Sequence, residues 1–301
     1  MIKVEKIRKT FKNDFWSKPQ VVLDDVCLNI NEGDLIGFLG VNGAGKTTLL
    51  KIIMKYISHD HGNIIFSESM GKNRREILSN IGFLPERPYF YPYLQGREFL
   101  NLISELNNIP KNISQERISI WANRLKIDHA LNKQLKDYSK GMLQRIGFVS
   151  VLLCNPKLVI LDEPLAGLDP IGRKEFKDIL REINDEGVTV FFSSHIVNDV
   201  EEVCSKVIVL EAGQIIYEGL ISALVKEHQS KLYRAQLQIN TGESLPEDYQ
   251  ILSKDGDLTL IEFQSEYRDK LIALTSNSNI NLISLYPKHV SLEDIIYKID
   301  K

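Results

Sequence analysis

The segment whose residue types point most directly to chemistry is a glycine-rich stretch followed by a lysine and a threonine. It reads GVNGAGKTTLLKIIMKY from Gly40 to Tyr56 and fits the pattern G-x-x-x-x-G-K-[ST]. Glycines let successive backbone N–H groups point at phosphate oxygens, and the helix behind such a loop presents its positive end to the same anion. We therefore expect nucleotide contacts from the loop and the start of its helix: Gly40, Asn42, Gly43, Ala44, Gly45, Lys46, Thr47 and Thr48.

Two of these side chains have specific expected roles. Lys46 reaches the β- and γ-phosphates, and the Thr47 hydroxyl binds Mg²⁺. The flanking sequence supports this prediction, because the apolar run DLIGFLG before the loop is typical of a buried strand and apolar residues recur at helical spacing behind it. The alternative is a glycine-rich turn with an accidental lysine.

A second candidate group is the acidic pair in LVILDEP, which lies at the end of an apolar strand. Sites of α/β folds lie at the carboxyl ends of their strands. We expect Asp162 to hold Mg²⁺ through water and Glu163 to polarise the attacking water. A strand-end acidic pair can also act only as a helix cap.

Composition and charge limit the class of protein. The chain has 301 residues, of which 43% are hydrophobic and 26% charged, which is ordinary for one large or two modest globular domains. The formal charge of −3 disfavours a nucleic-acid partner. No run approaches the roughly 18 apolar residues that span a bilayer, and the N-terminus lacks the apolar core of a signal peptide, so we expect a cytoplasmic chain.

The cysteines and histidines show no metal-ligand spacing. Each of Cys27, Cys154 and Cys204 has apolar neighbours, so we expect buried free thiols rather than a disulfide or metal site. His59 and His61 flank Asp60 in a segment that reads as a solvated turn.

The order of strand and helix patterns predicts two domains. Strand-like runs surround the phosphate loop, and two amphipathic helix patterns follow within a helical insertion at about 87–155. Strands then alternate with helices up to about residue 220, which implies an α/β domain with a parallel sheet. Residues 230–301 have their own alternation, typical of a small α+β domain, and end in a helix with Ser291 as its expected N-cap.

These motifs together resemble the ATP-binding subunits of ABC transporters over residues 1 to about 220. That family has a signature segment, most often LSGGQ, shortly before the strand with the acidic pair, and YSKGMLQR occupies this place. The resemblance implies that Ser139 and Gly141 contact the γ-phosphate of ATP bound to the opposite subunit. Tyr138, Lys140 and Met142 depart from the common form.

Further motifs follow in the order that the family has. AGLDP resembles the D-loop, which implies that Asp169 lies at the dimer seam. SSH resembles the switch segment, which implies that His195 lies near the γ-phosphate and orients Glu163.

Two further positions can be compared with the family: the aromatic residue that stacks on adenine and the end of the strand before the helical insertion. Phe11 corresponds to the stacking aromatic, with Phe15 or Trp16 as competitors and core packing as the alternative. Where the family usually has a glutamine that binds Mg²⁺, this chain has Glu86, which can also bind a hard cation. Four aromatic residues follow that either line a groove for a partner's coupling helix or pack in the core: Tyr89, Phe90, Tyr91 and Tyr93.

The resemblance implies a P-loop ABC ATPase domain at 1–220 with a small accessory domain at 230–301. Its implied function is Mg²⁺-dependent ATP hydrolysis that powers transport through separate membrane permease subunits, on the inner face of the cell membrane. A second ATP-binding subunit, identical or different, is an expected partner. The signature form and the layout of the tail resemble drug and polysaccharide exporters, which implies export. A soluble ABC protein acting on ribosomes or DNA, and an unrelated P-loop GTPase, are the alternatives.

Overall fold

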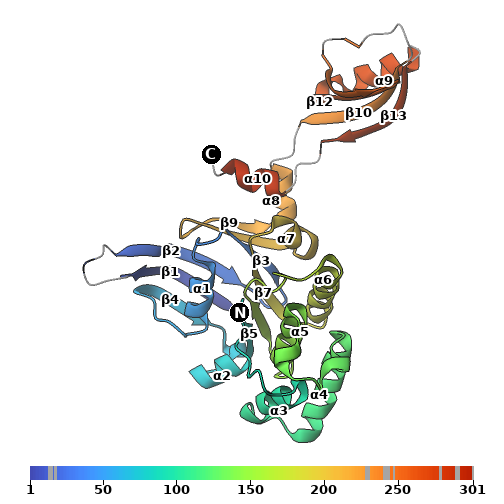
Figure 1. The fold of residues 1–301 in the computed structure, drawn as a ribbon. Coiled ribbons are helices and arrows are strands. Elements are labelled where there is room, and N and C mark those ends of the chain that lie inside the picture. Colours follow the sequence, from blue (N-terminus) through green and yellow to red (C-terminus); the bar gives the residue numbers. More distant parts are fainter. Residues whose placement is uncertain are drawn as a thin grey trace. The chain divides into compact units, whose positions relative to one another are not determined.

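The computed structural model describes residues 1–12, 16, 19–227, 231–239, 245–246, 248–277, 280–288 and 292–299. The chain forms two compact units, Met1–Ile221 and Ser222–Lys301 (Figure 1). In the described part of the chain, no helix has the length and apolar content needed to cross a bilayer.

A mostly parallel sheet of six strands positions the motifs of the first unit. Its order is β5-β6-β7-β3-β8-β9, and only the β8–β9 pair is antiparallel. The central strands are buried along their whole length, which explains why they read as continuous apolar runs. The strands are β3 (Leu35–Leu39), β5 (Ile81–Leu84), β6 (Leu158–Leu161), β7 (Thr189–Ser194), β8 (Lys206–Glu211) and β9 (Gln214–Leu220).

A smaller antiparallel sheet has the order β2-β1-β4. It consists of β1 (Ile2–Phe11), β2 (Gln20–Ile30) and β4 (His61–Phe66). Strand β1 contains register shifts against both neighbours, and Lys6 has a left-handed φ of 50° within it. Strand β1 nevertheless pairs with both β2 and β4.

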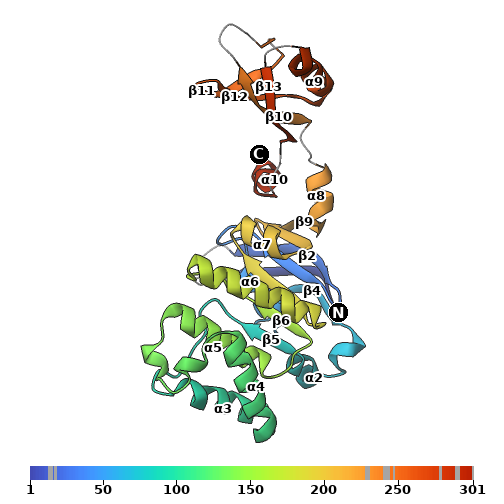
Figure 2. The ribbon, with the colours of Figure 1, turned by 90° about the vertical axis from the view of Figure 1, so that its right-hand side faces the viewer.

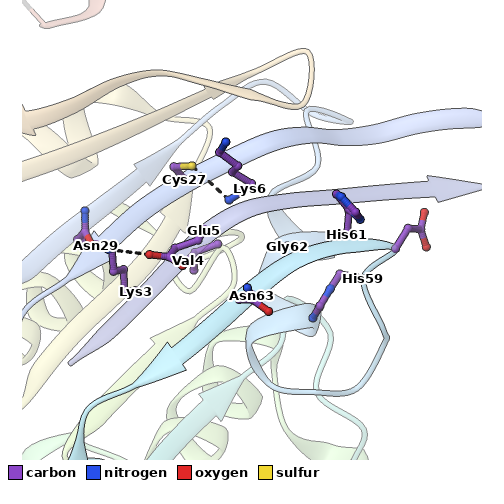
Figure 3. A pocket seen from close by; sticks show the side chains of 11 residues that line it. Lys3, Val4, Glu5, Lys6, Cys27, Asn29, His59, His61, Gly62 and Asn63 are labelled. Carbon is purple, nitrogen blue, oxygen red and sulfur yellow. Dashed lines mark hydrogen bonds and ion pairs between the residues drawn. The ribbon is translucent and has the colours of Figure 1, made fainter.

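The outer surface of this sheet holds a hollow of about 820 Å³ (Figure 3). It includes Cys27, whose Sγ accepts a hydrogen bond from the Lys6 N–H at 3.2 Å. The expectation of three buried thiols was wrong for Cys27, which is exposed, and for Cys154, which is half-buried. Cys27 alternates with the buried Val26 and Leu28 along β2, so apolar neighbours in a strand mark the opposite face.

The hollow does not bring a metal site together. His59 and His61 line it, but the described residues contain no group of three His, Cys, Asp or Glu side chains that could hold a metal ion. Asp60 accepts hydrogen bonds from the backbone N–H and the hydroxyl of Thr10, both at 2.6 Å, and with Lys9 they lower the pKa of this carboxyl to about 2.

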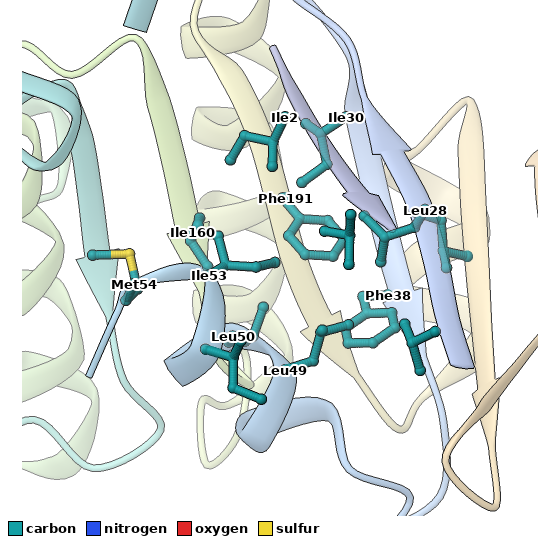
Figure 4. Packing of buried hydrophobic residues seen from close by; sticks show 14 of the residues in the cluster. Ile2, Leu28, Ile30, Phe38, Leu49, Leu50, Ile53, Met54, Ile160 and Phe191 are labelled. Atoms are coloured by element: carbon teal, nitrogen blue, oxygen red, sulfur yellow. The ribbon is translucent and has the colours of Figure 1, made fainter. Parts of the chain in front are cut away.

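The main core lies between the two sheets and the helix that follows the phosphate loop, α1 (Lys46–Ile53) (Figure 4). The rings of Phe38 and Phe191 lie 5.2 Å apart between centroids. Leu49 and Leu50 of α1 are fully buried beside them. Burying each of these side chains stabilises the fold by about 1.5–3 kcal/mol. The apolar pattern behind the loop therefore anchors the loop itself.

Helices α6 (Pro170–Asp185) and α7 (Val197–Val203) pack beside the parallel sheet (Figure 2). Helix α7 lies so close to β3 that a Cβ on Gly37 would collide with the Val200 side chain. The helical insertion contains α3 (Gly96–Leu106), α4 (Lys111–Arg124) and α5 (Lys140–Leu152), with the 3₁₀ turns η2 (Asp128–Ala130) and η3 (Leu135–Asp137). The turn η1 (Glu68–Met70) and α2 (Arg74–Ser79) lie between β4 and β5.

The second unit contains an antiparallel sheet with the order β11-β12-β10-β13. Its core contains Ala235, Leu237, Ile261, Phe263 and Leu271. Its elements are β10 (Leu232–Ile239), β11 (Gln250–Asp255), β12 (Leu258–Gln264), η4 (Ser265–Tyr267), α9 (Arg268–Asn277), β13 (Ile280–Pro287) and α10 (Leu292–Ile299), and α8 (Ile221–Glu227) begins at the boundary. The expected N-cap Ser291 lies outside the described residues.

Candidate functional site

The glycine-rich loop joins the carboxyl end of β3 to the first residue of α1, as its sequence predicts. Gly43 and Gly45 have φ values of 87° and 108°, a region that residues with a Cβ rarely adopt. Gly45 is the N-cap of α1 and no side chain caps that helix end. The N–H groups at the start of α1 are therefore available to an anion.

Lys46 is the cation at the centre of this loop, and it is only 6% exposed. Its Nζ donates to the Gly40 carbonyl at 2.6 Å and lies 3.3 Å from Glu163 Oε1. Because a buried ammonium needs partners, these two contacts hold Lys46 over the loop.

Thr47 and the acidic pair are joined by a chain of short hydrogen bonds. The Thr47 hydroxyl donates to Asp162 Oδ2 at 2.7 Å, and the Ser193 hydroxyl donates to Asp162 Oδ1 at 2.6 Å. Ser193 Oγ also accepts the Glu163 N–H at 2.9 Å. Ser193, at the end of β7, thus connects both members of the pair. The sequence did not single it out, because Ser194 follows it directly and has the same side chain.

Glu163 and His195 face each other across the carboxyl ends of β6 and β7. His195 Nδ1 lies 2.8 Å from Glu163 Oε2, and the Glu163 side chain is 12% exposed. Glu163 has a left-handed φ of 49°, a conformation that costs about 1–3 kcal/mol for a residue with a Cβ. The carboxylate is therefore held between an ammonium and an imidazole, with its position fixed by its own backbone and by Ser193.

These groups border a cavity of about 360 Å³ at the phosphate loop. Glu86 lines it with a half-exposed side chain, whose Oε1 lies 3.8 Å from Arg87 Nε. The lining residues are Val22, Val41, Asn42, Gly43, Gly45, Lys46, Thr47, Thr48, Glu86 and Glu163. The structure thus brings together most of the loop residues, Glu86 and Glu163.

The signature-like segment begins α5 but does not line this cavity within the described chain. Ser139 is the exposed N-cap of α5 and accepts the Met142 N–H at 3.2 Å. Tyr138 is buried, its hydroxyl donates to the Ala130 carbonyl at 2.7 Å, and burial raises its pKa. The Tyr138 departure is therefore a packing feature of the helical insertion.

The Lys140 departure contacts the D-loop-like segment. A Cβ built on Gly167 would lie 2.6 Å from Lys140 Cε and 2.7 Å from its Cδ, so the lysine side chain covers this glycine. Asp169 is the N-cap of α6, and its Oδ1 accepts the Gly172 N–H at 3.0 Å. Both segments therefore adopt defined positions next to each other within one chain.

The candidate aromatic contacts differ in exposure. Phe11 ends β1, is 37% exposed and has the Lys9 ammonium 5.2 Å from its ring centroid; it does not line the cavity. Trp16 is 93% exposed, and Phe15 lies outside the described residues. After Glu86, Phe90 packs edge-on against Phe99, whereas three aromatic side chains are exposed: Tyr89, Tyr91 and Tyr93.

Residues 23–166 match the family model described as ABC transporter. An uncharacterised ABC transporter ATP-binding protein of Synechocystis sp. is 35% identical over 298 residues, covering 98% of this chain and 83% of the relative. The bacitracin transport ATP-binding protein BcrA of Bacillus licheniformis is 34% identical over 289 residues, covering 93% of this chain and 92% of the relative.

Among solved structures, cbiO1 of Clostridium perfringens, described as part of the ABC transporter complex cbiONQ, has a TM-score of 0.64 and 27% identity. The match covers 75% of this chain and 91% of that one. With the phosphate loop, the acidic pair and the histidine assembled at one edge of the parallel sheet, the chain belongs to the ABC transporter ATP-binding proteins, the subunits that bind and hydrolyse ATP to power transport, dimerise and work with membrane permeases.

Proposed function

We propose that this chain hydrolyses ATP in composite sites formed by two copies and thereby drives export through separate membrane subunits. In each site Lys46, Thr47, Glu163 and His195 of one copy act on an ATP molecule that Ser139 and Gly141 of the partner subunit also contact. The observation that carries the proposal is the position of Glu163, whose Oε1 lies 3.3 Å from Lys46 Nζ and whose Oε2 lies 2.8 Å from His195 Nδ1.

The chemistry follows from these contacts. Lys46 exchanges the Gly40 carbonyl for the β- and γ-phosphate oxygens, whose charge it neutralises. Glu163 accepts a hydrogen bond from the attacking water and takes up its proton. With Nδ1–H donating to Glu163, a neutral imidazole has no proton on Nε2, so His195 orients Glu163 and donates to the γ-phosphate only as the imidazolium.

The donor set at Thr47 and Asp162 fits Mg²⁺. A hydroxyl and a carboxylate are hard oxygen ligands, Asp162 is fully buried beside the cavity, and Glu86 lines the same space. Mg²⁺ usually takes only one or two protein ligands together with phosphate and water. When bound, the ion would neutralise negative charge on the β- and γ-oxygens, and Thr47, Asp162 and Glu86 are the residues that would hold it.

The need for a second copy is supported by the position of the signature segment. Ser139 is exposed and does not line the cavity that holds Lys46, and the first turn of α5 carries no acidic side chain that would repel a phosphate. A γ-phosphate seated on one copy is therefore a suitable ligand for this helix end on another copy.

In this proposal, the membrane subunit binds the segment after Glu86. Three exposed tyrosines there form an amphipathic surface that suits an apolar helix from a permease subunit: Tyr89, Tyr91 and Tyr93. The export direction is supported by the resemblance of the tail and signature to exporters. This arrangement would hold the chain on the inner face of the cell membrane.

Lys46→Ala tests the catalytic assignment. We expect Mg²⁺-dependent ATP hydrolysis to fall at least about hundredfold, because the loop loses the cation that faces the transferred phosphate. Lys51→Ala, an exposed lysine in the last turn of the same helix, is the matched control and should keep normal turnover. Equal turnover in Lys46→Ala and Lys51→Ala would overturn the phosphate-loop assignment.

A further inference from the structure

Two helices of the first unit begin directly after residues of the site. Helix α6 has Asp169 as its N-cap, and α7 begins two residues after His195. The two helices contact each other through charged side chains. We call this group the α6–α7 clasp, defined by Arg173, Lys177, Asp199 and Glu202.

The clasp contains a nearly buried ion pair. Lys177 Nζ lies 2.8 Å from Asp199 Oδ1 and 2.6 Å from Glu202 Oε2, and the side chains of Lys177 and Asp199 are 9% and 5% exposed. Burial alone lowers the pKa of the Lys177 ammonium, but the bonds to Asp199 and Glu202 outweigh burial and raise it. Lys177 is therefore a fixed cation, and it holds one carboxylate oxygen of Asp199 in place.

The other oxygen of Asp199 is not fully bonded. Asp199 Oδ2 is buried and accepts no hydrogen bond within the described structure, and Arg173 Nη1 lies 3.6 Å from it. Charge-assisted hydrogen bonds are about 2.7–2.9 Å long, so Arg173 stops short of bonding. An unsatisfied buried carboxylate oxygen favours any movement that completes this bond.

There is space for such a movement. A cavity of about 500 Å³ borders the clasp, and the half-exposed Arg173 side chain lines it. Two residues of the D-loop and α6 start, Leu168 and Pro170, line the same cavity. A change in the D-loop-like segment therefore changes the walls around the Arg173 guanidinium.

Helix α7 is held on two sides, by the packing of Val200 against Gly37 of β3 and by the contact of Asp199 with α6. Helix α7 has seven residues, and its N-cap Ile196 makes no side-chain cap hydrogen bond. Asp199 lies in its first turn, one turn after His195. A shift of Asp199 toward α6 therefore moves the peptide that carries His195.

We propose that Asp199 is a positioning residue that couples the D-loop-like segment to His195 through Arg173. When a second copy contacts the D-loop, Arg173 closes on Asp199 Oδ2, and α7 then holds the His195 imidazole against Glu163. Neither Arg173 nor Asp199 lines the phosphate-loop cavity, so in this proposal both act through His195. The inference rests on the proposed roles of Glu163 and His195.

The test is a double-mutant cycle on steady-state ATP hydrolysis by the full chain. Arg173→Met and Asp199→Asn are each expected to lower kcat about tenfold, with unchanged KM and unchanged ATP affinity in calorimetric titration. The double variant should be no slower than the slower single variant, because both remove one interaction. Lys174→Met is the matched control: Lys174 lines the same cavity, is exposed and should leave kcat unchanged.

The outcomes separate this inference from the proposed function. Losses that multiply in the double variant, a normal kcat in Arg173→Met, or an equal loss in Lys174→Met would each overturn the clasp. If Asp199→Asn does not fold, Arg173→Lys decides the question, since it keeps the charge and should recover part of the kcat lost in Arg173→Met. Normal turnover in Lys46→Ala would instead overturn the catalytic assignment, whatever the clasp variants do.

Discussion

The phosphate-loop half and the signature half of the ATPase differ in how their side chains are held. At the phosphate loop, Lys46, Asp162, Glu163 and His195 are joined to one another or to the loop by contacts of 2.6–3.3 Å. In the signature segment, the exposed Ser139 bonds only to the N–H of its own helix turn.

This difference indicates that the side chains of the first half are already oriented within one chain, whereas the second half needs a partner. The first half has Lys46 and Asp162 buried and oriented before ATP arrives, which lowers the reorganisation that catalysis requires. The second half presents an exposed helix end capped by its own Ser139. Substitutions in the first half should change the chemical step, and those in the second should change assembly.

Ser193→Ala changes the phosphate-loop half, and we expect it to have the largest effect of the next three variants. It removes the hydroxyl that serves both Asp162 and Glu163 and leaves Asp162 Oδ1 without its donor, at a cost of about 2 kcal/mol. We expect kcat to fall about 30-fold with little change in ATP affinity. Ser150→Ala, whose hydroxyl bonds only to the Gly147 carbonyl of its own helix, is the control. A drop in affinity with normal kcat would place Ser193 outside the chemical step.

Ser139→Ala changes the signature half. Removing one hydrogen bond to a charged phosphate should lower turnover about tenfold, while calorimetric titration at low protein concentration shows normal ATP affinity. Because Ser139 also caps α5, Asn73→Ala is the control: it removes a side-chain cap of the same kind from α2. If both variants lose the same activity, Ser139 acts only as a cap.

Glu86→Gln gives the smallest expected effect. Glu86 lines the phosphate-loop cavity, so its charge repels phosphate oxygens unless a cation lies between them. The substitution should weaken the dependence of ATP affinity on Mg²⁺ about threefold, measured by calorimetry with and without Mg²⁺ in both proteins. An identical Mg²⁺ dependence would show that Glu86 acts elsewhere, such as at the membrane-subunit contact.

The parallel sheet could be predicted from sequence because its strands are buried on both faces and read as apolar runs between helices. The phosphate loop could also be predicted, because the turn around a phosphate needs its glycines and lysine at fixed positions along the chain. Local pattern alone does not specify helix boundaries: the second helix of the insertion begins at Lys111, directly after Pro110, and ends at Arg124 before the left-handed Lys126.

Features that depend on which way a side chain faces were not predictable. Ser193 and Ser194 are adjacent serines in a buried strand, yet one bonds Asp162 and the other bonds the backbone of Ile196. The exposure of Cys27, by contrast, follows from the alternation along β2, because the buried Val26 and Leu28 place its side chain on the opposite face. The clasp joins Arg173 and Asp199 from helices whose packing no local pattern specifies.

The most direct test of the shared-site account is the mass of Glu163→Gln with saturating ATP and Mg²⁺. The substitution removes the carboxylate that takes up the proton of water but keeps the loop, so ATP stays bound and intact between two copies. Light scattering after size exclusion should then show twice the mass of one chain with ATP and a single-chain mass with ADP. A single-chain mass at saturating ATP and high protein concentration, or a doubled mass that does not depend on nucleotide, would contradict it.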